Sequence, residues 1–500
     1  MKNTLANGSD IIKLKWKFFI YRLVSYFSFL FIPVYAQKVL HINQWAMAFL
    51  MMFYILFIIS QWFLLGKEID HRFKIYFRVN SSIDRIVYRL FLGMFFFILL
   101  FNLINLLDSK WIYNSYWITW SILGLFYSWP TRGKIIQESV SSNFGEFRFL
   151  DNFEKTLVAL IFIMFVFSLP DLPPLVNIEM LKLYFDPLER LGNPLWNFLL
   201  INYYPFKSHP DLFRLAWSLH FYIVGMGLFV LVFYAFLRFF VSRRLSLLGV
   251  FALVSSWSFS KTLITNVEFS TLTTYSLIWV WTLLWVTKSS TYRAGLFMGL
   301  VSFWGTLINP SFAILVFFQI GFLIFVCLRE RTLWFKRQLL KYASFGVILT
   351  IFRLLSHTDL LDPLHSLDLS VFKHFGQELN RKGFYILGVF GFLILFIKFY
   401  LPKKVLFKEF QLERESTMIF LFSISIYVLF SLVWDDSLVA GFGMMWPLAF
   451  LSLIPLELLF QSLSRVRSRR NMIYVIYILI CLLDSHFEGR VKVFFKIFNS

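Results

Sequence analysis

Apolar residues in this chain form long runs, and short clusters of charged residues separate those runs. Most runs are roughly 17 to 25 residues long, which as a helix spans the hydrocarbon core of a bilayer. The pattern predicts an all-α, polytopic bundle of about thirteen to fifteen transmembrane helices. The first run ends near Pro33, and the others lie near 44–66, 88–107, 111–129, 154–170, 215–240, 246–260, 271–287, 294–308, 309–328, 340–355, 383–401, 418–434, 438–460 and 471–484.

The first run could be a cleaved signal peptide or a retained anchor. Val34-Tyr35-Ala36 resembles a small-x-small cleavage site, whereas Arg22 lies at the start of the apolar stretch and many spans follow. We favour the retained anchor.

Composition supports a membrane protein. Of the 500 residues, 59% are hydrophobic and only 15% are charged, against roughly 25% charged in soluble domains. The net charge of +20 comes from short clusters between the runs, which fits cytoplasmic loops better than a nucleic-acid surface. We expect no nucleic-acid partner, a cytoplasmic N-terminus and a place in a bacterial inner membrane. Cys327 and Cys481 both lie in apolar segments and suit neither a disulfide framework nor a metal site.

We expect three parts along the chain. Residues 1–150 form an N-terminal four-span extension, 151–355 a core, and 356–500 a C-terminal bundle. Two non-cytoplasmic loops, 170–214 and 356–382, are longer than turns. Regularly spaced apolar and aromatic residues in them predict short amphipathic helices on the membrane surface.

Candidate catalytic carboxylates lie in the first of these loops. Asp171 follows a predicted span directly, and Asp186 and Glu189 come later. A carboxylate at a membrane boundary can act as a general base; the alternative is an ordinary solvated loop acid.

Three arginines on the predicted non-cytoplasmic side are candidates for binding a lipid phosphate: Arg190, Arg214 and Arg353. Guanidinium groups bind phosphate through paired hydrogen bonds, although such residues also snorkel to headgroups. His220, inside a predicted span, is interpreted as a hydrogen-bonded packing residue.

Residues 209–316 resemble the middle of the GT-C membrane glycosyltransferases, which use polyprenyl-phosphate-linked sugars (protein mannosyltransferase-like and aminoarabinose transferase-like proteins). The resemblance rests on the order of His209-Pro210, Arg214-Leu215, a Tyr234 to Arg238 helix end, and Ile308-Asn309-Pro310. Asp171 stands alone where many family members have an acidic pair.

The resemblance implies that the sugar passes from a polyprenyl-phosphate donor to an acceptor on the non-cytoplasmic face, with inversion. Asp171, Asp186 or Glu189 would supply the base, and Arg190, Arg214 or Arg353 would bind the phosphate. His209 and Tyr204 are the expected contacts with donor or acceptor. The partners are then the lipid-linked sugar, membrane lipids and an acceptor glycan, lipid or protein; neither a metal nor another cofactor is expected.

Two other classes of function stay open. A transporter or lipid flippase would use broken helices near the bilayer centre, for which Asn309-Pro310 is a candidate. A non-catalytic subunit of a membrane assembly is the third reading.

Overall fold

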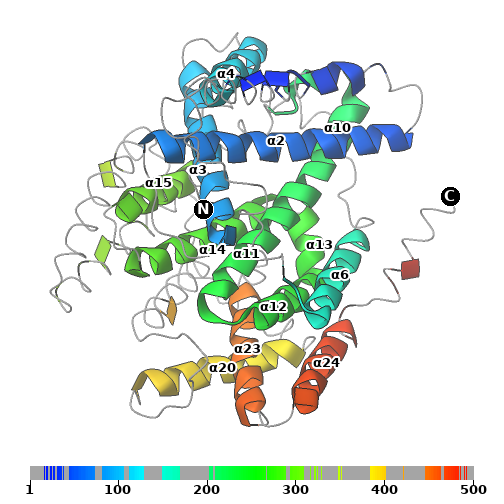
Figure 1. Cartoon of the computed structure of the whole chain (residues 1–500), viewed down its shortest axis with the longest axis vertical. Helices are drawn as coiled ribbons and strands as arrows, with labels where there is room; N and C mark the ends of the chain where they lie inside the picture. The colour runs from blue at the N-terminus through cyan, green and yellow to red at the C-terminus, as the bar shows by residue number, and fades with distance from the viewer. Residues whose placement is uncertain are drawn as a thin grey trace, which may run out of the picture. The chain divides into compact units, whose positions relative to one another are not determined.

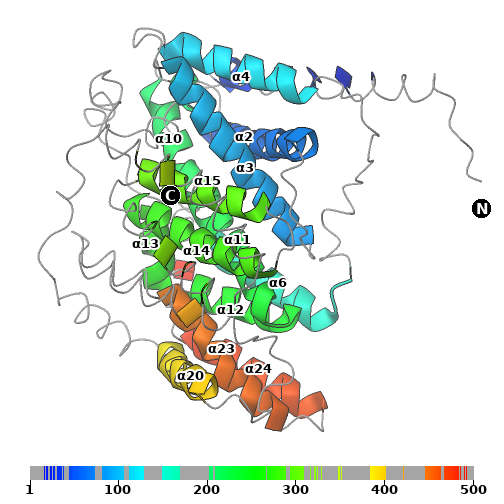
Figure 2. The same cartoon turned by 90° about the vertical axis from the view of Figure 1, so that its left-hand side faces the viewer.

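All regular secondary structure in the described part of the chain is helical, in a computed structural model (Figures 1 and 2). This agrees with the predicted all-α class. The structure describes residues 16, 19–20, 23–24, 26–28, 31–36, 38, 44–73, 82–105, 112–128, 149–168, 202–206, 209–265, 267–288, 293–308, 316, 320–321, 324, 328, 347–348, 351, 383–400, 420–421, 445–462, 467–483, 485, 489 and 491–492.

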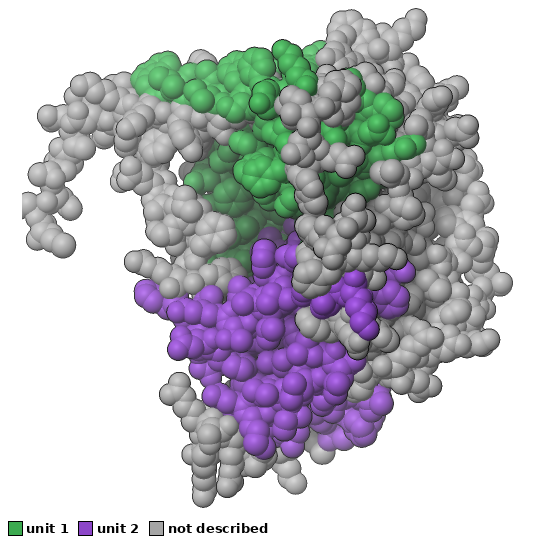
Figure 3. Space-filling model, turned by 90° about the vertical axis from the view of Figure 1, so that its right-hand side faces the viewer, with its two compact units in different colours: residues 1–148, 174–223 green, residues 149–173, 224–500 purple. Residues whose placement is uncertain are grey.

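The chain divides into two compact units (Figure 3). Unit 1 is Met1–Arg148 with Pro174–Ile223, and unit 2 is Phe149–Pro173 with Val224–Ser500. The three predicted parts are continuous stretches of sequence, whereas each of these units combines two stretches. The division into three parts stays a prediction.

Unit 1 is built on a pair of closely packed helices, α2 (Gln44–Phe73) and α3 (Ser82–Asn105). Gly66 and Gly93 lie at their crossing, and an added Cβ would come within 1.7 Å of the Arg89 carbonyl oxygen or 1.8 Å of that of Trp62. Only glycine allows the two backbones to approach this closely. Helices α4 (Ile112–Ser128) and α10 (Pro210–His220) also pack on α2.

A buried ion pair joins the same two helices. Arg89 Nε lies 3.2 Å from Asp70 Oδ2, and each side chain is only 2% exposed. The predicted spans 44–66 and 88–107 end and begin inside these two helices, which are longer at the side that carries the ion pair. The helices extend to Phe73 and from Ser82, because Asp70 and Arg89 neutralise each other and can therefore be buried.

Helix α12 (Arg243–Ser255) is the central helix of unit 2. Every residue from Leu245 to Ser255 is buried, which is typical of a helix surrounded by others. Around it pack α6 (Asn152–Val166), α11 (Gly227–Phe240), α13 (Trp257–Thr265), α23 (Met445–Ser462) and α24 (Arg467–Leu483). Helix α14 (Val267–Lys288) packs on α11, α13 and α15 (Arg293–Ile308).

Aromatic rings fill the core of unit 2 between α11 and α23. The ring centroid of Phe236 lies 5.4 Å from those of Trp446 and Phe450, and the ring centroid of Phe240 lies 5.0 Å from that of Phe450. Such edge-on and tilted contacts add to the burial of apolar area. Helix α20 (Gly383–Tyr400) reaches α23 through Gly391, where a Cβ would lie 1.9 Å from the Leu451 carbonyl oxygen.

The helical run from Pro210 to Phe240 contains a π-helical segment, Phe221–Met226. The units divide within this segment, between Ile223 and Val224. Gly225 lies in it, and a Cβ there would meet the Ser270 hydroxyl at 2.7 Å. Segments of this kind recur at functional positions in helices.

Two helices are long and apolar enough to cross a membrane, Ala46–Arg72 and Pro210–Phe240, by length and composition alone. Shorter apolar helices include Trp117–Phe126, Ile386–Ile397 and Trp446–Leu459. The longer described helices lie in predicted spans, but the predicted span 246–260 is divided at Ser256 between α12 and α13, and α13 continues to Thr265, beyond that span.

Exposed faces of several helices are apolar. On α20 the face repeats every three to four residues, as a single helix side does. It includes Ile386, Val389, Phe390, Leu393, Phe396 and Ile397. Monomers in water seldom expose apolar patches this continuous, so these faces are suited to contact with lipid.

Candidate functional site

The strongest candidate site is the start of α10 in unit 1. Pro210 is its first residue, and the Phe213 N–H donates to the His209 carbonyl oxygen at 3.0 Å. Proline suits this position because its fixed φ is helical and it lacks an N–H that would have no partner. The start of a helix carries partial positive charge and therefore favours anions.

Arg214 lies one turn into α10 and is half-buried. Its Nε is buried and has no hydrogen-bond partner within the described ranges. A buried guanidinium donor without an acceptor costs free energy. This atom can therefore gain more from an anionic ligand than a donor already bonded to protein.

Ser218 follows Arg214 by four residues and so lies on the same side of the helix. It is 4% exposed, and its Oγ also has no hydrogen-bond partner among the described residues. Sequence reasoning missed Ser218, because a serine in an apolar helix usually bonds to its own backbone. Two donors on one face can both be used by an acceptor with several oxygens, such as phosphate.

An aromatic anchor ties the segment before α10 to the rest of unit 1. The Tyr203 hydroxyl is hydrogen-bonded to His220 Nδ1, and the Tyr54 hydroxyl of α2 donates to the Asn202 carbonyl oxygen. The Trp217 ring stacks on His220, with centroids 6.0 Å apart. These contacts hold Asn202 to Phe206 against α2 and α10, and so fix the approach to the helix start.

The expectation that His220 is a hydrogen-bonded packing residue is confirmed, since it is 2% exposed and bonded to Tyr203. The predicted contact residue Tyr204 begins the 3₁₀ turn Tyr204–Phe206, and its role stays a prediction. The hydrogen-bond partner of His220 is instead the neighbouring Tyr203, which belongs to no motif in the sequence.

His209 and Arg214 are the predicted site residues that the structure brings together, five positions apart at one helix start. Asp171, Asp186, Glu189, Arg190 and Arg353 lie outside the described residues, so their roles stay predictions. Within the described ranges no group of three His, Cys, Asp or Glu side chains could hold a metal ion.

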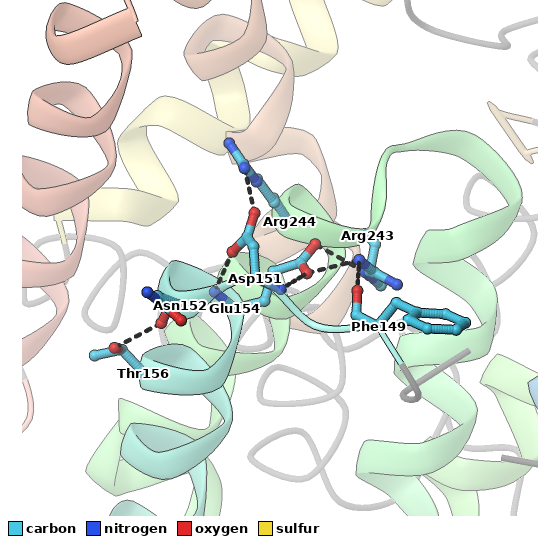
Figure 4. A network of polar contacts seen from close by, with 7 residues as sticks. All are labelled: Phe149, Asp151, Asn152, Glu154, Thr156, Arg243 and Arg244. Atoms are coloured by element: carbon cyan, nitrogen blue, oxygen red, sulfur yellow. Dashed lines mark hydrogen bonds and ion pairs between the residues drawn. The ribbon is translucent and has the colours of Figure 1, made fainter. Parts of the chain in front are cut away.

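A second polar cluster lies in unit 2, where the starts of α6 and α12 meet (Figure 4). Asp151 and Glu154 form a capping box on α6: the Glu154 N–H donates to Asp151 Oδ1 at 2.8 Å, and the Asp151 N–H donates to Glu154 Oε2 at 2.9 Å. Such a box satisfies two amide groups that would otherwise lack partners.

Two arginines of α12 bind these carboxylates. Arg243 donates from Nε to Glu154 Oε1 at 2.8 Å and from Nη2 to Glu154 Oε2 at 2.7 Å, while Arg244 pairs with Asp151. Burial alone would raise the pKa of Asp151, but the Glu154 N–H and the two guanidinium groups outweigh it and lower this pKa. The sequence contains the Asp-x-x-Glu signal of the box but not its partners, which lie about ninety residues away.

Comparisons with protein-family models, with curated proteins and with solved structures find no match to this chain.

Proposed function

We propose that the chain is a multi-pass membrane enzyme that transfers a sugar from a polyprenyl-phosphate donor to an acceptor on the non-cytoplasmic side. The N-terminus and the basic loops face the cytoplasm, following the positive-inside tendency, and the membrane is the inner membrane of a bacterium. The long apolar helices and the exposed apolar faces support the membrane part of the proposal.

The observation that carries the proposal is the buried Nε of Arg214, which lacks an acceptor in the described structure. In the proposed topology the start of α10 faces the non-cytoplasmic side, so Arg214 lies at headgroup depth. A lipid-linked sugar places its phosphate at that depth, since its polyprenyl chain stays in the bilayer. Arg214 and the positive end of α10 would stabilise the charge that develops on the leaving phosphate.

The reaction proposed is a single displacement. The acceptor hydroxyl oxygen attacks the anomeric carbon, the bond from that carbon to the phosphate oxygen breaks, and polyprenyl phosphate leaves with the electron pair. Asp171 takes the proton of the hydroxyl, with Asp186 and Glu189 as the other candidate bases. One displacement inverts the anomeric carbon.

A lipid transporter or flippase is the second candidate, and the π-helical segment Phe221–Met226 favours it. Interrupted helices form substrate sites in many transporters. Such a protein would bind the same lipid phosphate at Arg214 without breaking a bond.

The test uses the full chain in nanodiscs with synthetic polyprenyl-phosphate sugars. We expect the wild type to consume donor, Asp171→Asn to bind donor without turnover, and Arg214→Gln to raise KM at least about tenfold, or about 1.4 kcal/mol. Lys261→Gln is the matched control, because Lys261 is an exposed cation over the Trp257 ring, and it should behave as wild type.

Each other outcome changes the conclusion. Donor that binds and crosses the bilayer intact would replace the transferase with a transporter. Turnover by Asp171→Asn at the wild-type rate would exclude Asp171 as the base. A donor that neither binds nor reacts would overturn the proposed function.

A further inference from the structure

Helix α6 of unit 2 changes character one turn after its start. Its first residues expose polar side chains at Asn152, Lys155 and Thr156. From Val158 onward the exposed side is largely apolar, with Phe162 65% exposed. A helix that leaves the headgroup layer and enters the hydrocarbon has this order of side chains.

Helix α24 follows the same order. Three arginines, Arg467, Arg469 and Arg470, lie in its first turn. An exposed apolar face follows, made of Met472, Val475, Ile476, Leu479 and Leu483.

The two polar starts lie near one another. The Phe153 and Tyr474 rings stack with centroids 5.5 Å apart, both helices pack on α12, and both run in the same direction in Figures 1 and 2. Tyr474 is seven residues past Arg467, so the start of α24 extends roughly 9 Å beyond that of α6. That offset slightly exceeds the thickness of one headgroup layer, roughly 5 to 8 Å.

We define the basic rim as residues 149–155, 243–244 and 467–470 of unit 2. It holds six basic residues and two acidic ones, a surplus of four positive charges. Arg244 pairs with Asp151 and Arg243 with Glu154 (Figure 4), so the four remaining basic residues of the count are Lys155, Arg467, Arg469 and Arg470. Phe149 precedes α6, its carbonyl oxygen accepts a hydrogen bond from Arg243, and its side chain is 75% exposed, as aromatic residues at membrane interfaces are.

We infer that the basic rim binds the headgroups of anionic phospholipids in the cytoplasmic leaflet, while the exposed faces of α6 and α24 contact their acyl chains. Each basic side chain near an anionic leaflet contributes attraction that falls off within a Debye length. The inference rests on the membrane part of the proposed function and is independent of glycosyl transfer.

The test measures which lipids lie next to the rim. A fluorophore is attached at Phe149→Cys, in a chain that also carries Cys327→Ser and Cys481→Ser, and the chain is reconstituted in vesicles of phosphatidylcholine and phosphatidylglycerol. A headgroup nitroxide is placed on one lipid or the other at equal mole fraction. We expect labelled phosphatidylglycerol to quench at least twofold more than labelled phosphatidylcholine.

Charge should control this preference. Replacing Arg467, Arg469 and Arg470 by Gln together with Lys155→Gln should bring the quenching ratio to about one, and 0.5 M salt should do the same. Phe162→Cys is the matched control: its fluorophore should be quenched by acyl-chain nitroxides with no headgroup preference. Thermal melting identifies any variant that fails to fold.

The quenching data distinguish a failure of the basic rim from a failure of the membrane part of the proposed function. Equal quenching by both headgroup-labelled lipids at position 149, with acyl-chain quenching at 162, would overturn the basic rim and leave the membrane protein intact. No quenching at either position would overturn both the rim and the membrane part of the proposed function. Loss of glycosyl transfer alone would count against the proposed enzyme activity, and it would leave both the basic rim and the membrane location standing.

Discussion

Arginines at two helix starts differ in what surrounds them. In unit 2, Arg243 donates to both oxygens of Glu154 and to the Phe149 carbonyl oxygen. In unit 1, Arg214 has a buried Nε with no acceptor in the described part of the chain. An arginine that protein groups satisfy stabilises the fold, whereas one with an unused buried donor has capacity for a ligand. Burial and hydrogen-bond partners therefore distinguish these two arginines, whereas their shared position near a helix start does not.

The largest effect should come from breaking the satisfied pair. Glu154→Gln leaves Arg243 opposite a neutral amide, and we expect a loss of about 3 kcal/mol, because removing one partner leaves a partly buried charge uncompensated. The free energy of unfolding is measured by tryptophan fluorescence in mixed micelles as the SDS fraction rises. A loss below about 1 kcal/mol would make the pair no better than a surface ion pair.

Within unit 1, the hydrogen bond between Tyr203 and His220 should contribute to stability rather than to ligand binding, although His220 lies on the same helix as Arg214. His220→Phe leaves the buried Tyr203 hydroxyl without this partner, and we expect a loss of about 2 kcal/mol. The double variant Tyr203→Phe/His220→Phe should be more stable than His220→Phe alone, since both partners are then apolar. A double variant that is less stable would show that the bond is not the source of the effect.

Removing the ion pair between Asp151 and Arg244 should lower the free energy of unfolding by a smaller amount, and that amount should depend on pH. The pKa of Asp151 in the folded protein is lowered from the ordinary value of 3.8, so its stabilisation is complete above about pH 5 and is lost as the pH falls through the folded pKa. Asp151→Asn keeps the helix cap and should cost about 0.5 kcal/mol at pH 7. Melting curves from pH 3 to pH 7 should converge for wild type and variant at the acid end; curves that stay parallel would contradict this account.

The smallest effect should come from Ser218. Its buried hydroxyl has no partner among the described residues, so Ser218→Ala should leave stability within about 0.5 kcal/mol or raise it slightly. Ala449→Ser adds a hydroxyl at a fully buried position and serves as the reverse control, expected to destabilise. A clear loss of stability in Ser218→Ala would mean that the hydroxyl is already satisfied and has no spare capacity.

The positions of the described helices could largely be predicted from the sequence, because long apolar runs without Gly and Pro clusters are typical of helices. The helix ends were harder. Charges at Asp70 and Arg89 appeared to end two helices, yet they pair across the helix crossing and become buried. A pattern along one segment cannot indicate a partner on another.

The same limit applies to the candidate site. Arg214 could be selected from its position on the predicted non-cytoplasmic side, and His209-Pro210 from the helix-start signal. Tyr203 and Ser218 could not, because Tyr203 matters through its contact with His220 and Ser218 through its lack of a hydrogen-bond partner among the described residues. Both are properties of packing rather than of residue type.

Binding of polyprenyl phosphate to wild type and to Arg214→Gln in nanodiscs tests whether Arg214 binds a lipid phosphate. Melting temperature and dissociation constant are measured together, with Lys261→Gln as the control. We expect binding at least about tenfold weaker in Arg214→Gln, with an unchanged melting temperature in the absence of ligand. Equal affinity in the two proteins, or a fold that depends on Arg214 as much as on Glu154, would contradict the claim that this arginine is reserved for a ligand.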